Sequence, residues 1–222
     1  MKRACFVLFG LGLFPATALW PQVADQGTLI IRLSGHEIGR EDFRVQPARQ
    51  GRASGDSLIT TARYPEVRPQ AELRAALERS SSAGFSFHLD LLVPQGASQI
   101  YASGGRNRVT VRSVARGSET GREYPGGSPL VILDDSLFAL FLPAADLATE
   151  AGQRITAIYP RTGRRLTFLA RRRGPTARVG EADLILIQFT GDLEGSLYLD
   201  AQGRLARVVF PGTATEATRV PN

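Results

Sequence analysis

Short stretches in which apolar and polar residues alternate run along most of the chain. Residues 28–33 and 41–45 show this alternation on either side of the glycine-containing segment 34–39, and residues 57–64 repeat it. Successive side chains of a β-strand point to opposite faces, so a period of two is typical of half-buried strands. The pattern predicts an opening hairpin followed by a third strand.

One segment in the first half has a different period. Leu73, Ala76 and Leu77 are spaced within residues 71–80 so that they would share one face of a helix. This spacing predicts a short helix or turn between two strands.

The second half of the chain repeats the strand pattern at short intervals. Most of the connections are brief and contain glycine, which favours antiparallel pairing, because a parallel crossover needs a dozen or more residues. The sequence thus predicts a mainly β protein, a curved antiparallel sheet or half-barrel packed on one or two short helices. Eight strands are expected here, at 84–94, 98–104, 108–115, 153–160, 164–173, 182–189, 195–200 and 203–211.

Residues 130–148 form the most apolar stretch after the N-terminal segment. Residues 137–142 are apolar almost all round, so a helix here belongs in the interior, in the concave face of the sheet. Pro143 favours two short helical turns over one long helix. Asp134 or Asp135 would serve as the helix cap, an interpretation we prefer to an acid-base pair, because adjacent side chains diverge.

The first residues have the pattern of a secretory signal peptide. Lys2 and Arg3 precede a short apolar run that ends near the small residues 16–18. We therefore expect a cleaved signal peptide at 1–18, a periplasmic or secreted protein, and no transmembrane segment in the mature chain. Residues 19–222 are expected to form a single β-rich domain with a frayed C-terminal tail from about 212.

Charge and composition remove several classes of function. The net charge of the whole chain is +6, and loss of Lys2 and Arg3 leaves 25 basic against 21 acidic residues, a weaker excess than nucleic-acid-binding domains usually carry. No phosphate-binding glycine loop is present, so we expect no cofactor. The mature chain would lack cysteine, and its two histidines, His36 and His88, are far apart, so no metal site is expected.

Ser86, His88 and Asp90 share one face of the expected strand 84–94. Along a strand they would lie about 7 Å apart from one to the next, too far for a direct catalytic relay. We therefore read them as the polar face of a half-buried strand and keep a hydrolase with His88 as its base only as a third hypothesis.

Arginines gather on the expected hairpin that follows residue 160. They could meet lipid headgroups or another polyanion, but a solvated hairpin is the preferred interpretation in a chain whose basic residues are nearly all arginine. The residues are Arg161, Arg164, Arg165, Arg171, Arg172 and Arg173.

Three short motifs resemble a group of uncharacterised bacterial secreted proteins. They are the glycine hairpin at 35–39, the sequence ILDDS-L at 132–137 and the hairpin LD-x-x-GRL-x-R at 199–207. The folds of these proteins are expected to be similar to the half-barrel of Lol-type lipoprotein carriers. In such carriers the concave face and its helical plug hold acyl chains, so the resemblance implies a hydrophobic ligand.

These observations favour an exported, non-enzymatic binding or carrier protein for a lipid-like or other apolar ligand. An envelope assembly or scaffold protein that acts through protein contacts is the alternative, and an apolar cavity would distinguish the two. The residues expected to contact the ligand are Phe85, Phe87, Phe138, Phe141 and Leu142.

Overall fold

The computed structural model describes residues 25–50, 53–67, 69–80, 84–105, 107–127, 129–179 and 182–221. The predicted signal peptide at 1–18 lies outside these residues. These described residues are mostly β, with 70% of them in strands, and they form one large open curved sheet and one short α-helix. Within the described ranges, no helix is long and apolar enough to cross a membrane.

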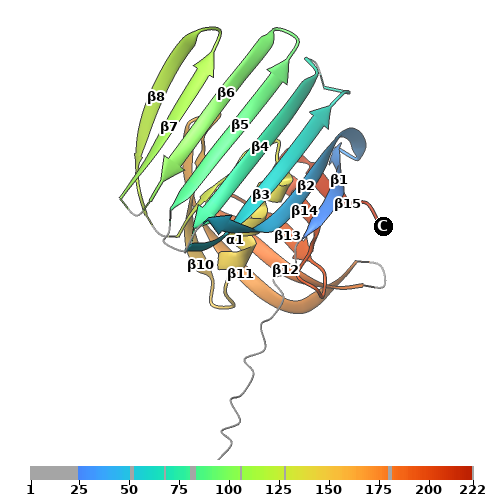
Figure 1. Ribbon diagram of the computed structural model, residues 1–222. Coiled ribbons are helices and arrows are strands. Elements are labelled where there is room, and N and C mark those ends of the chain that lie inside the picture. The colour runs from blue at the N-terminus through green and yellow to red at the C-terminus, as the bar shows by residue number, and fades with distance from the viewer. Residues whose placement is uncertain are drawn as a thin grey trace, which may run out of the picture.

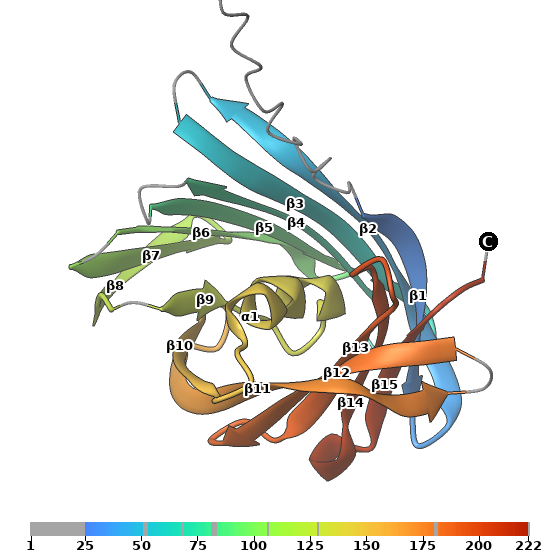
Figure 2. The ribbon, with the colours of Figure 1, turned by 90° about the horizontal axis from the view of Figure 1, so that it is seen from below.

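The described strands form one continuous sheet. Its order is β8-β7-β6-β5-β4-β3-β2-β1-β15-β14-β13-β12-β11-β10-β9, so it curls round from the β8 edge to the β9 edge (Figures 1 and 2). Neighbours pair antiparallel except for the parallel pair β9 and β10. The strands are β1 Gln26–Leu33, β2 His36–Gln50, β3 Ala53–Tyr64, β4 Ala71–Ser80, β5 Phe85–Val93, β6 Gly96–Gly104, β7 Arg108–Ala115, β8 Ser118–Pro125, β9 Leu130–Ile132, β10 Gln153–Tyr159, β11 Arg164–Val179, β12 Ala182–Gly191, β13 Gly195–Leu199, β14 Leu205–Phe210 and β15 Thr215–Arg219.

The predicted opening hairpin is confirmed. β1 and β2 are joined by a turn at Ser34 and Gly35, where Gly35 has a φ of +84°, a conformation that glycine adopts without strain. Further along β2, a Cβ atom on Gly39 would lie 2.7 Å from the ring of Tyr64. Glycine at this position allows the Tyr64 ring to lie directly against the backbone of β2.

The helix predicted at 71–80 is wrong, because these residues form β4. Leu73, Ala75 and Leu77 are buried on one face of the strand, whereas Arg74 is exposed on the other. β4 pairs along its length with both β3 and β5. Those two ladders satisfy its backbone, and they override the helical propensity of alanine and leucine.

The expectation of a frayed tail from about residue 212 is also wrong for residues 215–219. They form β15, which pairs with β1 on one side and with β14 on the other. Ala217 is fully buried opposite Ile31 of β1. Backbone ladders hold this strand on both sides, and its charged side chains add two ion pairs, Glu216 with Arg207 and Arg219 with Asp25, each at 2.9 Å.

The apolar segment after residue 136 lies inside the curve of the sheet, as predicted (Figure 2). It forms a 3₁₀ helix, η1 (Phe138–Phe141), followed directly by the α-helix α1 (Leu142–Leu147). Pro143 lies in the first turn of α1, where a proline is tolerated because its missing N–H has no helical partner. We call residues 138–147 the plug, and its η1 part is at most 2% exposed.

β15 joins the two halves of the sheet, and its removal is a direct test of the fold. A chain that ends after Ala214 would leave β1 and β14 without a shared neighbour, so we expect it to lose its cooperative thermal unfolding transition. Circular dichroism would measure this loss. A chain that ends after Pro221 keeps β15 and serves as the control, and a truncated chain that unfolds like this control would contradict the role given to β15.

Candidate functional site

The plug is held by a carboxylate that comes from the sheet. Glu41 of β2 is fully buried, and its two oxygens accept hydrogen bonds from the backbone N–H groups of Phe138 (2.6 Å) and Ala139 (3.0 Å). The hydroxyl of Thr60 in β3 donates to the same carboxylate at 2.6 Å. These are N–H groups at the start of a helix, which have no partner within the helix itself. Glu41 therefore fixes the position of the plug in the sheet.

Burial governs the protonation of Glu41. Removal from water raises the pKa of its carboxyl from 4.5 to about 7, although the hydrogen bonds from Thr60, Ala139 and Phe138 act in the opposite direction. The negative charge of Asp134 adds to the rise. Glu41 is thus a buried acid that titrates near neutral pH.

The helix-cap role expected of Asp134 and Asp135 is wrong. Leu137 precedes η1, and no side chain from the segment before the helix caps it. Asp134 is 1% exposed and binds Arg161 through both of its oxygens, each at 2.7 Å. Asp135 binds Arg164 at the surface at 2.6 Å. Both aspartates therefore bind the segment that precedes the plug to the hairpin of β10 and β11. Arg161 and Arg164, two of the clustered arginines, are engaged in these ion pairs.

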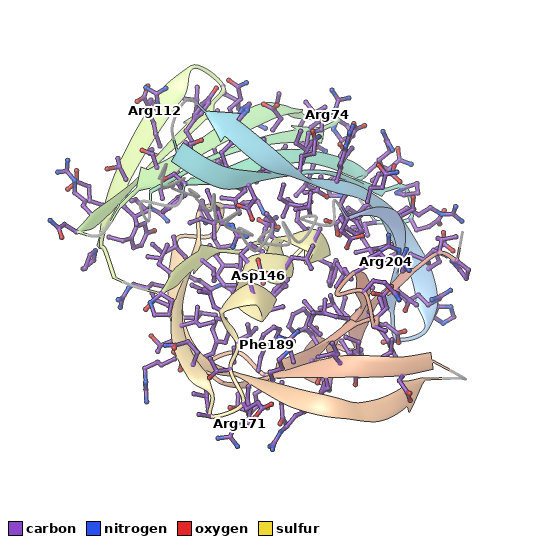
Figure 3. All side chains as sticks on the ribbon, turned by 60° about the horizontal axis from the view of Figure 1, so that its bottom comes forward. Arg74, Arg112, Asp146, Arg171, Phe189 and Arg204 are labelled. Atoms are coloured by element: carbon purple, nitrogen blue, oxygen red, sulfur yellow. The ribbon has the colours of Figure 1, made fainter. Side chains whose placement is uncertain are left out.

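Two further contacts hold the plug in place. The hydroxyl of Tyr64 donates to the carbonyl oxygen of Ser136 at 2.6 Å, and burial raises the pKa of this hydroxyl, which keeps it protonated. At the other end, Asp146 of α1 binds Arg79 of β4 at 2.8 Å, and Arg79 also pairs with Asp56 of β3. Asp146 lies on the concave side of the sheet, whereas Arg74 and Arg112 extend from its outer face (Figure 3).

A pocket of about 630 Å³ opens beside the plug. Its floor is largely aromatic: the ring of Phe210 lies 4.9 Å from that of Phe141 and 6.3 Å from that of Phe138. Its mouth carries charged and hydroxyl side chains. The lining residues are Asp135, Phe138, Phe141, Tyr159, Arg164, Leu166, Gly191, Asp192, Leu193, Glu194, Phe210, Gly212, Thr213 and Thr215.

The expected ligand residues are only partly brought together. Phe138 and Phe141 contribute to the floor of this pocket, but Leu142 does not line it. Phe85 and Phe87 lie on β5, away from this lining, and Phe87 is buried in the core. Ligand contact by these five residues stays a prediction.

Glu41 and most of the pocket residues were not predicted from the sequence. A signal for Glu41 was present, because Glu41, Phe43 and Val45 alternate along β2, which places the acid on the same face as two apolar residues. Phe210 carried no such signal, since it ends a strand and contacts the plug only through the tertiary fold.

His88 and Asp90 lie closer together than the strand spacing suggested. Their side chains meet at 3.2 Å between Nε2 and Oδ1, and the imidazole stacks on Tyr101 at 4.7 Å. Ser86 donates instead to Glu78, at 3.3 Å. The three side chains therefore form no serine–histidine relay, and they lie on the outer face of β5. In the described part of the chain, no three His, Cys, Asp or Glu side chains are grouped as a metal site requires.

Arg161 and Arg164 allow a matched test of the two aspartates. Arg161→Ala would leave the buried carboxylate of Asp134 without its cation, so we expect the free energy of unfolding to fall by about 3–5 kcal/mol. Arg164→Ala breaks an exposed pair and should cost less than about 1 kcal/mol. Urea denaturation measures both values, and equal losses would contradict the structural role of the Asp134 pair.

Glu41→Gln tests the buried acid. Because its folded pKa of about 7 lies above 4.5, Glu41 stabilises the protein most when it is protonated, and this contribution is lost as the pH rises through that interval. Glutamine does not titrate, so the variant should gain roughly 3 kcal/mol relative to the native protein between those limits. Urea denaturation across this range measures the difference. Glu37→Gln, an exposed change on the same strand, is the control. If the free energy of unfolding varied with pH in the same way for the native protein and Glu41→Gln, the raised pKa of Glu41 would be contradicted.

No protein-family model matches the chain, and no curated protein sequence is significantly similar to it. A crystal structure of a beta-barrel-like protein of domain of unknown function DUF1849 from Brucella abortus is similar in fold. Its TM-score is 0.53 at 10% identity, covering 89% of this chain and 96% of that one. A DUF1089 family protein from Pseudomonas aeruginosa matches with a TM-score of 0.40 at 14% identity, over 91% of this chain and 97% of that one. The first similarity supports a beta-barrel-like fold, and the relation to Lol-type carriers stays a prediction.

Proposed function

We propose that this protein is an exported, non-enzymatic binding or carrier protein for a lipid-like or other apolar ligand. The observation that carries the proposal is the pocket beside the plug. Its volume of about 630 Å³ is in the range of small-molecule sites, and its apolar floor with a polar mouth is typical of them.

The rigidity of the floor supports the same function. Phe138 and Phe141 belong to a helix that is tied to the sheet through Glu41, and their rings pack on Phe210 and Phe189. A floor that is ordered before binding loses little conformational entropy when a ligand enters. The N-terminal signal pattern supports export to the bacterial envelope or out of the cell.

One observation favours the second candidate, an envelope assembly or scaffold protein. Ala139, Leu140 and Ala144 are fully buried, so the plug fills much of the concave face that a carrier would leave open. In addition, β8 lies at an edge of the sheet, and nearly all of its side chains are exposed. An unpaired edge of this kind is suited to pairing with a strand of another protein.

Native mass spectrometry of the mature protein, purified from the envelope of its own host, tests the proposal. A stoichiometric apolar adduct, identified after organic extraction, is the expected result. A bare mass that persists after incubation with host lipids would contradict the carrier function and favour the scaffold.

A substitution at the mouth of the pocket connects such an adduct with this site. Thr213 is exposed on η2 (Pro211–Thr213), so Thr213→Trp should fold normally while its indole occupies part of the pocket. We expect the bound fraction to fall at least about tenfold, as for a ligand that has lost its site. Thr120→Trp adds the same indole to the exposed strand β8, outside the pocket lining, and is the control. Equal adduct on both variants, measured by native mass spectrometry, would place the ligand elsewhere.

A further inference from the structure

The mouth of the pocket is negatively charged. Four charged residues line it, and one pair cancels, because Arg164 binds Asp135 at 2.6 Å. Asp192 and Glu194 remain, both exposed in the turn between β12 and β13. Among the described residues, no arginine lies within ion-pair distance of either carboxylate. This local excess of negative charge stands out in a chain whose net charge is +6.

The same mouth is also rich in hydrogen-bond acceptors. The hydroxyl of Thr213 donates to the carbonyl oxygen of Phe210, and that of Thr215 donates to the carbonyl oxygen of Thr213, both at 3.2 Å. Their protons are thereby engaged, and their oxygens keep lone pairs that can accept. Asp192 accepts one bond, from the backbone N–H of Thr167 at 2.9 Å, which leaves its second oxygen for another donor.

The one cation of the mouth is already engaged. The guanidinium of Arg164 contacts both oxygens of Asp135 and lies 4.4 Å from the centre of the Tyr159 ring. An anionic headgroup would have to displace Asp135 from Arg164, and it would also face Asp192 and Glu194. Like charges brought together in this way oppose binding.

We propose that the ligand of this pocket is a single-chain amphiphile with a positively charged, hydrogen-bond-donating head such as an ammonium group. The inference rests on the proposed binding function. The chain of such a ligand lies on the floor formed by Phe138, Phe141 and Phe210, and its head meets Asp192 and Glu194 at the mouth. The negative charge of the mouth and its hydrogen-bond acceptors thus both favour the same end of the ligand, its cationic head.

Four probes with the same ten-carbon chain test this assignment: decylammonium, decyltrimethylammonium, decanol and decanoate. Isothermal titration calorimetry near pH 7, below micelle concentrations, measures each affinity. We expect decylammonium to bind about five- to tenfold more tightly than decanoate at low salt, and this ratio should shrink at about 0.5 M salt. The quaternary probe separates charge from donation, because its head is cationic but has no N–H.

Asp192→Asn combined with Glu194→Gln removes both charges, while the amide oxygen introduced by the first change can still accept the bond from the N–H of Thr167. This double variant should lose the preference for the cation. Glu119→Gln combined with Glu123→Gln removes two exposed charges from β8, outside the pocket, and should keep the preference.

The outcomes separate this inference from the proposed function. Preferential binding of decylammonium that disappears in the pocket variant supports it. Equal binding of all four probes, tighter binding of decanoate, or a preference that survives in the pocket variant overturns the ligand class but leaves an apolar binding protein. Absence of binding by every probe contradicts both the ligand class and the proposed binding function.

Discussion

A buried carboxylate at the start of a short apolar helix is the constraint on which the structure depends. The plug is apolar and cannot satisfy the N–H groups of its own first turn, and water does not reach them. Glu41 supplies the acceptor from β2, and Thr60 from β3 positions that acceptor. This contact also positions the floor of the pocket, because the backbone N–H of Phe138 donates to Glu41 while Phe138 itself lines the pocket.

The sequence was sufficient to predict those strands in which polar and apolar residues alternate clearly. The alternation in β5 and β7 indicated their strands, and the apolar residues 137–142 indicated the interior plug. Prediction failed at β4, where alanine and leucine fit either period, and only the flanking strands β3 and β5 decide between them. It failed at β15 because Thr215–Arg219 contains a single apolar residue, Ala217, and so shows no alternation that would indicate a strand.

The candidate site was less predictable because its residues come from several separate elements. Phe138 and Phe141 could be proposed as soon as the plug was recognised. Phe210 and Asp192 reach the same pocket from strand ends, and only the curl of the sheet brings them there. Asp134 shows the same limit, since its role depends on Arg161 from a hairpin that the local sequence does not connect with it.

The strand order has a consequence for how the chain is built. Read from β9 to β15 and then from β1 to β8, every neighbour in the sheet is also a neighbour in sequence, apart from the junction of β15 with β1. The fold is therefore a circularly permuted meander, in which the N-terminal strand lies in the middle of the sheet. While the chain is being synthesised, the edge of β1 has no partner until residues 215–219 emerge, so its backbone stays open to wrong pairing longer than that of any other strand that is finally paired on both sides.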